Sequence, residues 1–425
     1  MMKEQIRKLM QKGFIHIFGS NVINKIVQFS SSIFLVRLLM KEDYGNYSYA
    51  QNVLAIFMLF NGMGILFALL QFGSEAETKE KRNSFFKYSF KIGSRFNILI
   101  SVLLAAYSFV IFKDNIMASK LLVLMVLMPA FLFTFEYIQI YFRTNLMNKE
   151  FSRLSVYNTV AILVMSVSGA LSFGVMGVII GVYIAYFSSI LIGFYMLRKD
   201  LFFERISEPL TKKVKGEFKN YSTISMYNNV VSQFIYLLDI FIIGLLIKDA
   251  NIVATYKTAT LIPFALNFIP LSIMTFVYPY FAKNRDDHNW IIKRYKKLVS
   301  YLFLFNILVT ITLLVFAPLI IKILFGEEYL DGVPIFRMLS VGFFFASTFR
   351  TPAGNVLVML RKVKPLFVIN IIIGIVNIIS SYYMIKYYSM VGAAITNIVI
   401  IGLASLFYNI YLISFLRKKQ KQELI

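Results

Sequence analysis

Charged side chains inside long apolar segments are the residues of this sequence whose type and position could do chemistry. They are two acids and five bases, namely Glu136, Asp239, Lys25, Arg37, Lys257, Arg337 and Arg350. An ionised side chain near the centre of a bilayer costs about 2.5–3.5 kcal/mol on insertion scales, so it should pair with another charge or contact a ligand. The surplus of bases favours an anionic ligand such as a phosphate or pyrophosphate.

A polar stripe surrounds the first of these bases. Asn21, Lys25 and Gln28 fall at i, i+4 and i+7, so they share one face of a helix. A related stripe recurs 207 residues later, where Asn228 and Ser232 correspond to Asn21 and Lys25. We predict that the two stripes and the deeper bases contact a polar, anionic substrate. The predicted substrate-binding residues are Lys25, Arg350, Arg37, Lys257, Asn21, Gln28, Asn228 and Ser232.

Glu136 and Asp239 are the acids placed within apolar segments, and we predict them as ion-coupling groups because an intramembrane carboxyl can exchange a proton. The alternative for both is a structural ion pair with Lys25 or Arg350. For Arg37, as for other bases near helix ends, interhelical pairing or an extended side chain that reaches the membrane surface is an equal alternative.

Several other chemistries find no support in the sequence. It contains no Cys, and His16 and His288 are far apart and lie in no metal-ligand spacing. It also lacks the glycine-rich GxxxxGK[ST] phosphate loop of nucleotide hydrolases. We therefore predict no metal, no cofactor and no enzymatic activity.

The composition places these residues in a polytopic membrane protein. Of the 425 residues, 58% are hydrophobic and 15% are charged, against about 25% charged in soluble domains. The apolar residues form runs of roughly 20, which is the length of one bilayer crossing. The predicted crossings are 15–39, 47–70, 96–112, 121–141, 155–173, 175–197, 221–247, 255–281, 299–321, 334–360, 365–385 and 391–415. The predicted fold class is all-α with twelve transmembrane helices.

The net charge of +23 is distributed as an orientation signal. Alternate loops and both termini carry 33 Lys and Arg, whereas the intervening loops carry 6. This bias follows the positive-inside rule and predicts that both termini are cytoplasmic. The basic loops would then contact anionic lipid headgroups, so we predict membrane lipids rather than nucleic acid as the partner of these charges.

An internal repeat divides the chain. The segment 33–50 returns at 240–259, where Tyr256 and Ala259 correspond to Tyr47 and Ala50 at an offset of 209. Later, the segment GVMGVIIG at 174–181 matches SMVGAAIT at 389–396. Each half holds six predicted helices, an even number, so the halves should be related by an axis along the membrane normal. We predict two six-helix lobes, residues 1–205 and 221–425, joined by a cytoplasmic linker at 206–220.

Two motifs carry a resemblance to a known family. Leu35 to Ala50 reads LVRLLMKEDYGNYSYA, and Gly392-Ala393-Ala394 follows Asn377. Both resemble the polysaccharide-biosynthesis branch of the multidrug/oligosaccharidyl-lipid/polysaccharide exporter superfamily. The sequence departs from the family at Leu39-Met40-Lys41, where Leu-Gly-Pro is frequent. The family shares no single coupling-ion site, so none is carried over to this chain.

The resemblance implies a MATE-like fold of two lobes around a central cleft that opens alternately to each side. It implies a flippase in the bacterial cytoplasmic (inner) membrane that moves a polyprenyl-pyrophosphate-linked oligosaccharide to the outer leaflet. The expected partners are an undecaprenyl-pyrophosphate-linked oligosaccharide, membrane lipids and other polysaccharide-assembly proteins. The alternatives are a multidrug or cation antiporter, which would favour acidic cavity residues, and a membrane polymerase or glycosyltransferase, which typically has a large outer loop.

Overall fold

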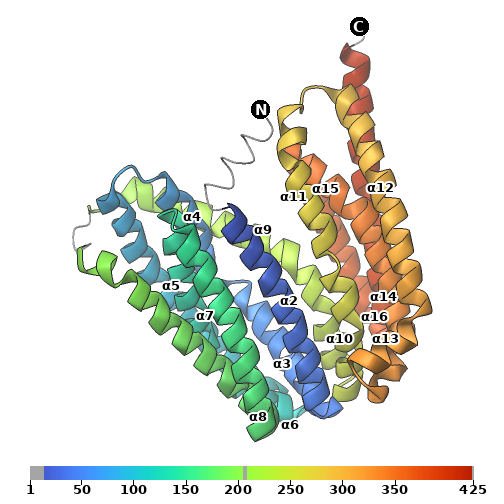
Figure 1. Cartoon of the computed structure of the whole chain (residues 1–425), viewed down its shortest axis with the longest axis horizontal. Coiled ribbons are helices and arrows are strands. Elements are labelled where there is room, and N and C mark those ends of the chain that lie inside the picture. Colours follow the sequence, from blue (N-terminus) through green and yellow to red (C-terminus); the bar gives the residue numbers. More distant parts are fainter. Residues whose placement is uncertain (1–13, 204–207, 424–425) are drawn as a thin grey trace. The chain divides into compact units, whose positions relative to one another are not determined.

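The structure is a computed structural model that describes residues 14–203 and 208–423. The side chains of a few residues in these ranges, Ser232 among them, are not described. The basic N-terminal segment and the first residues of the predicted linker also lie outside the description. Every regular element in the described ranges is a helix, and the chain divides into two compact units, unit 1 at residues 1–237 and unit 2 at 238–425 (Figure 1).

Unit 1 is built around the pair α7 and α8. Its helices are α2 (Phe14–Leu38), α3 (Lys41–Met58), the 3-10 helix η1 (Asn61–Gly64), α4 (Ile65–Glu75), α5 (Lys79–Ile111), α6 (Ile116–Leu124), α7 (Met128–Thr144), α8 (Asn148–Phe203) and most of α9 (Lys212–Leu246). Helices α2 and α7 both pack on α8, and α5 packs on α4, α6 and α7. An aromatic core joins α5 to α9, where the buried rings of Phe85 and Phe218 stack with centroids 5.3 Å apart.

Unit 2 contains the end of α9 and all later helices. They are α10 (Ala250–Ala265), α11 (Phe268–Lys283), α12 (His288–Val315), α13 (Ala317–Leu324), the 3-10 helix η2 (Glu327–Gly332), α14 (Val333–Phe345), the π-helical segment η3 (Ala346–Arg350), α15 (Thr351–Met359) and α16 (Val363–Glu423). Helix α14 packs on α10, α12 and α16. The buried Asn306 amide donates a 3.0 Å hydrogen bond to Thr348 Oγ1, which links α12 to η3.

Helices α8 and α16 each fold back on themselves. The backbone leaves the helical conformation at Gly174 (φ 58°, ψ −143°) and at Ser389 (φ 50°, ψ −135°). Beyond each turn the chain packs on the arm it has just left, so a Cβ on Gly177 or Gly392 would lie 2.0 Å from a backbone carbonyl oxygen. The two turns are 215 residues apart, the same offset as the sequence match between 174–181 and 389–396. That local match is therefore also a match in backbone conformation.

A left-handed break separates α3 from α4. Gly62, Met63 and Gly64 have φ values of 54°, 58° and 70°, a conformation that is uncommon outside glycine. The break is held by α9, because Ser222 Oγ donates a 2.6 Å hydrogen bond to the Met63 carbonyl oxygen. A Cβ on Gly64 would lie 2.5 Å from the Ser222 carbonyl oxygen, so only glycine permits this approach.

The described residues form a multi-pass membrane fold. Seven helices are long and apolar enough to cross a membrane, or up to nine if each of two bent pairs is one span. Two of the seven, at 148–198 and 364–420, contain the hairpins described above. Twelve crossings, the lobe boundaries and cytoplasmic termini remain predictions.

The α16 hairpin gives a matched test of close packing. We expect Gly392→Ala to lower the free energy of unfolding by about 1–3 kcal/mol, because the added methyl group meets backbone that cannot move away. Gly402→Ala, in the same helix but with no atom within 4 Å of the added Cβ, should not destabilise the protein. Thermal unfolding of the purified variants in detergent measures both. Equal stability of the two variants would contradict the hairpin packing.

Candidate functional site

Unit 1 contains a cavity of about 670 Å³ beside α7, with a polar stripe on a mainly apolar lining. Glu136, Gln139 and Arg143 lie at i, i+3 and i+7 on α7, so they share the face that lines it. The remaining polar lining consists of Gln51 from α3, Asn61 from η1 and Asn229 from α9. Apolar residues of α3, α4 and α8 complete the walls. The cavity thus combines one carboxylate, one guanidinium and four amides.

The η1 break places one of these amides against the carboxylate. Asn61 is the first residue of η1, and its Nδ2 donates a 2.7 Å hydrogen bond to Glu136 Oε2. Among the described residues, Asn61 is the hydrogen-bond partner of the Glu136 carboxylate, and this donor is a neutral amide. No described cation pairs with Glu136. The predicted structural ion pair is therefore not formed at Glu136 within unit 1.

Gln139 is the most unusual member of the cavity lining. Its side chain is only 7% exposed, yet neither Nε2 nor Oε1 has a hydrogen-bond partner. The Asn61 Oδ1 atom on the same cavity is also buried without a partner. Burying such a group unpaired costs about 1–3 kcal/mol, so these atoms mark where a bound polar molecule would be stabilised. An amide that offers both a donor and an acceptor suits the hydroxyl groups of a sugar.

Arg143 lies at the other end of the stripe, in the last turn of α7. Its Cζ is 5.8 Å from the centroid of the Phe151 ring, and the described residues provide no carboxylate for it. Seven residues separate it from Glu136, which is about 10 Å along a helix axis. The cavity therefore has its cation at one end and its carboxylate about two turns deeper.

The predicted stripe on α2 lies on the side of the helix away from α8. Asn21, Lys25 and Gln28 are exposed, whereas Asn24 is buried and donates a 2.7 Å hydrogen bond to Ser155 Oγ of α8. The expectation that Lys25 is buried is therefore wrong for unit 1 taken by itself, because the amide of Asn24 occupies the side that packs on α8. A substrate contact at the exposed stripe stays a prediction.

Asp239 is buried in unit 2 and held by neutral donors. Its Oδ2 accepts hydrogen bonds from Tyr256 Oη at 2.8 Å and from Asn397 Nδ2 at 3.3 Å. Lys257 follows Tyr256 on α10 and is partly buried, and no described carboxylate pairs with it. Arg350 is partly buried at the end of η3. An ion-coupling role for Asp239 stays a prediction.

Three further predicted residues belong to neither cluster. Arg37 and Asn228 are exposed and both have interactions within the structure. The Ser232 side chain lies outside the described part. Arg337 was considered as a buried base, but it is exposed and its Nε donates a 3.0 Å hydrogen bond to the Leu314 carbonyl oxygen. This contact joins α14 to α12.

Sequence reasoning found Glu136 but missed the residues around it. Gln139 carries no charge, and Arg143 lies just beyond the predicted crossing 121–141, among the bases of the loop that follows it. The signal that could have found them is the stripe Leu132, Glu136, Gln139 and Arg143, which follows the helical spacing i, i+4, i+7 and i+11. Asn61 lies 75 residues before Glu136 and no sequence pattern connects the two, so their hydrogen bond could not be foreseen.

The described residues form an all-helical, membrane-type fold with a cavity among the helices of unit 1. The structure is similar to the lipid II flippase MurJ in an inward closed conformation, with a TM-score of 0.77 and 16% identity over 96% of this chain and 91% of that one. It is also similar to an inward-facing multidrug resistance MATE family transporter of the MOP superfamily, with a TM-score of 0.73 and 12% identity over 94% and 96% of the two chains.

The sequence itself identifies the family. The model of the polysaccharide biosynthesis protein family matches residues 10–285, and the chain belongs to that family. A protein of Shigella flexneri named as an O-antigen transporter candidate is 29% identical over 210 residues, which are 49% of this chain and 49% of that protein. The match thus spans about half the length of this relative. The resemblance seen in the sequence motifs is confirmed at the level of the family.

Gln139 allows stability and function to be separated. We expect Gln139→Leu to stabilise the substrate-free protein by about 1–3 kcal/mol, because it removes an unpartnered buried amide. The same change should reduce export of the substrate. Gln71→Leu, at an exposed position of α4 outside the cavity, should leave export unchanged. Thermal unfolding and export are measured on both variants, and a Gln139→Leu protein that is less stable but fully active would contradict this reading of the cavity.

Proposed function

We propose that this protein is a flippase for a polyprenyl-pyrophosphate-linked oligosaccharide repeat unit. It moves the repeat unit from the inner to the outer leaflet of the bacterial cytoplasmic membrane by alternating access, for assembly of the lipopolysaccharide O-antigen, a capsule or another surface polysaccharide. The proposal is supported by membership of the polysaccharide biosynthesis family and by the similarity to an O-antigen transporter candidate. The fold, which is similar to that of a lipid II flippase, also supports it.

The order of polar groups along α7 is the observation that carries the proposal. Arg143 belongs to the segment 142–154, which the positive-inside rule places at the cytoplasmic surface. A guanidinium there suits the pyrophosphate, which stays at headgroup depth in the inner leaflet. Gln139, Asn61 and Glu136 lie deeper along the same cavity and offer hydrogen bonds to sugar hydroxyls. The polyprenyl chain needs no polar path, because it can remain in the lipid.

The stripe on α2 extends this proposal to a second polar surface. Asn21, Lys25 and Gln28 are exposed along one face of α2, and Lys25 supplies a cation for the pyrophosphate during its passage. Arg350, Lys257 and Arg37 are proposed to serve the same anion. The proposed topology has twelve crossings, with both termini in the cytoplasm.

Glu136 is the observation that favours a second candidate function, a multidrug or cation antiporter. A cavity carboxylate whose described partner is a neutral amide could bind an organic cation or exchange a proton. The similarity in fold to a MATE transporter fits this candidate as well. The flippase is favoured because the same cavity contains Arg143, which a cationic substrate would meet with repulsion.

Arg143 tests anion recognition. We expect Arg143→Gln to reduce repeat-unit export roughly tenfold, because a charge-assisted hydrogen bond contributes about 1.5–3 kcal/mol. Arg143→Lys should retain more export than Arg143→Gln. Arg153→Gln removes the same charge from an exposed position of α8 outside the cavity and should export normally. Lipid-linked sugar analysis at matched expression measures all three variants.

The same assay decides the role of Lys25. Lys25→Arg should retain more export than Lys25→Ala if the ammonium contacts the pyrophosphate. Normal export by Lys25→Ala would remove Lys25 from the site. Equal loss in both variants together with poor membrane insertion would assign Lys25 a folding role instead.

Glu136 distinguishes proton coupling from sugar binding. Glu136→Gln keeps the shape and the Asn61 neighbour but cannot exchange a proton. If Glu136 couples transport to protons, the variant should lose the pH dependence of export while substrate binding persists. If Glu136 only accepts hydrogen bonds from sugars, binding should weaken and the pH profile should keep its shape. An organic cation transported by the wild type in exchange for protons would instead support the antiporter.

A further inference from the structure

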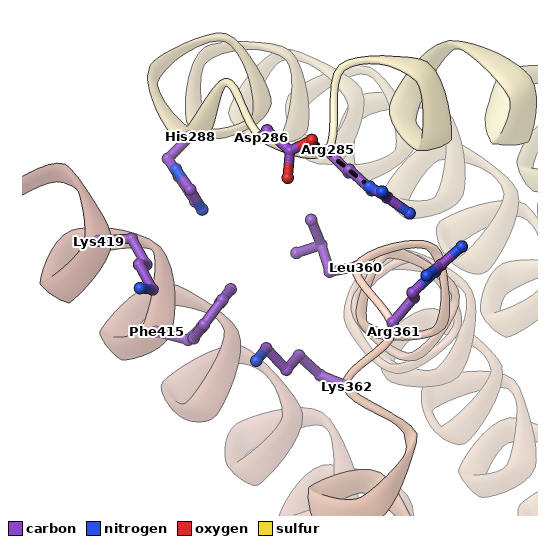
Figure 2. A pocket seen from close by; sticks show the side chains of 8 residues that line it. All are labelled: Arg285, Asp286, His288, Leu360, Arg361, Lys362, Phe415 and Lys419. Carbon is purple, nitrogen blue, oxygen red and sulfur yellow. Dashed lines mark hydrogen bonds and ion pairs between the residues drawn. The ribbon is translucent and has the colours of Figure 1, made fainter. Parts of the chain in front are cut away.

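A basic pocket of about 520 Å³ lies in unit 2 (Figure 2). It is lined by Arg285, Asp286, His288, Leu360, Arg361, Lys362, Phe415 and Lys419. Four of these are Lys or Arg and one is an acid, so the pocket is net positive. Such a pocket attracts an anion.

Three segments that are far apart in the sequence form the pocket. Residues 285–288 connect α11 to α12, residues 360–362 connect α15 to α16, and residues 415–419 lie near the end of α16. A 2.6 Å hydrogen bond from Gln420 Nε2 to Asn289 Oδ1 joins α16 to the start of α12. The charge bias of the sequence places all three segments at the cytoplasmic side. The pocket therefore lies at one end of the membrane-spanning helices.

The cations are not required by the local fold. Arg361 has a φ of 58°, and the turn closes with a 2.8 Å hydrogen bond from the Lys362 backbone N–H to the Leu357 carbonyl oxygen. Unit 1 forms the same turn between α7 and α8, where Leu146 has a φ of 57° and Met147 donates an equivalent 2.8 Å bond. The turn thus accepts two apolar residues in unit 1 and presents two cations in unit 2.

The two units also differ near the start of α5 in unit 1 and of α12 in unit 2, because only α5 has a cation in the position compared. In unit 1, Arg82 of α5 donates to the Gly73 carbonyl oxygen at 3.1 Å and to Asn145 Oδ1 at 2.5 Å, so its guanidinium holds the fold together. Thr78 caps the N-terminus of α5 and Asp287 caps the N-terminus of α12, so residues of these two helices correspond at an offset of 209. At that offset Arg82 corresponds to Ile291, which is fully buried. In unit 2 the cations lie on the pocket instead.

Contacts inside the pocket leave much of this charge unneutralised. Arg285 Nε lies 3.5 Å from Asp286 Oδ2, and both side chains remain well exposed. Lys362 Nζ lies 4.4 Å from the centroid of the Phe415 ring. Within the described part of the chain, neither Arg361 nor Lys419 has a carboxylate partner. The acid therefore offsets one of four permanent cations.

The floor of the pocket is apolar. Leu360 and Phe415 supply it, and the His288 ring meets the Phe415 ring edge to face with centroids 6.0 Å apart. Just before Phe415 in α16, Ile410 and Ile413 are exposed apolar side chains. A ligand that combines an anionic head with an apolar body fits this arrangement better than a free anion, because it contacts the cations and the floor together.

We propose that this pocket binds the phosphate group of an anionic phospholipid from the inner leaflet. Arg361, Lys362 and Lys419 bind the phosphate oxygens, and Phe415 and Leu360 contact the glycerol backbone and the first acyl carbons. The ligand is a resident lipid and not the transported molecule, so the inference does not depend on the proposed function. Its phosphate chemistry is shared with soluble phosphate esters, which the experiment must distinguish.

Native mass spectrometry of the full-length protein in detergent measures retained lipid directly. With phosphatidylglycerol and phosphatidylcholine supplied in equal amounts, we expect the protein to retain phosphatidylglycerol selectively. Arg361→Gln combined with Lys362→Gln should weaken that retention on the order of tenfold or more, since each basic residue near the membrane surface contributes to binding. Arg361→Lys combined with Lys362→Arg should retain the lipid.

The matched control removes the same charge elsewhere on the same side of unit 2. Lys293→Gln combined with Lys296→Gln changes two exposed residues of α12 that do not line the pocket, so selectivity for phosphatidylglycerol should persist. Equal loss in the control would show general surface attraction and overturn the proposal. Displacement of the lipid by millimolar glycerol phosphate or inorganic phosphate would show a site for soluble phosphate and would overturn the lipid assignment. A melting temperature close to that of the wild type confirms that each variant is folded.

Discussion

The hydrogen bond from Asn61 to Glu136 connects the two features on which the candidate site depends. One is the left-handed break at Gly62–Gly64, which turns the chain between α3 and α4 and is held by Ser222 of α9. The other is the polar stripe of α7, which carries the carboxylate. A membrane helix normally pairs all of its backbone groups internally, so a break is tolerated where protein packing or a cavity satisfies them. Here the break provides an amide side chain beside the carboxylate that lines the cavity.

The lining of the proposed substrate cavity is less stable when empty than an apolar lining would be. Gln139 is buried with both amide atoms unpartnered, and an apolar residue of similar volume would stabilise the empty protein. The α7 stripe is polar where substrate would bind, while Phe133 and Phe142 on other faces of the same helix are buried in the core. The same helix therefore serves both the hydrophobic core and the site, and its period of 3.6 residues separates the two roles.

Much of the fold could be predicted from the sequence because it depends on patterns that the chain repeats. Gly174 and Ser389 share one backbone conformation at the offset that their neighbouring residues predict, and Tyr47 and Tyr256 are both buried at the predicted correspondence. The site was predicted less well. A charge in an apolar run, such as Glu136, is visible from composition alone. An uncharged amide becomes informative only when the structure shows it buried without a partner, and the direction of the α2 stripe depends on which of its polar residues packs on α8.

The central claim is that the unit 1 cavity receives the glycan of a lipid-linked oligosaccharide. A photo-crosslinking amino acid placed at Leu132, on the cavity wall, tests it most directly in cells that make the repeat unit. The same amino acid at Val164, on an exposed face of α8 outside the cavity, is the control. The account predicts an adduct that carries the mass of the glycan at position 132 and only phospholipid or no adduct at position 164. Glycan adducts at both positions, or phospholipid alone at position 132, would contradict it.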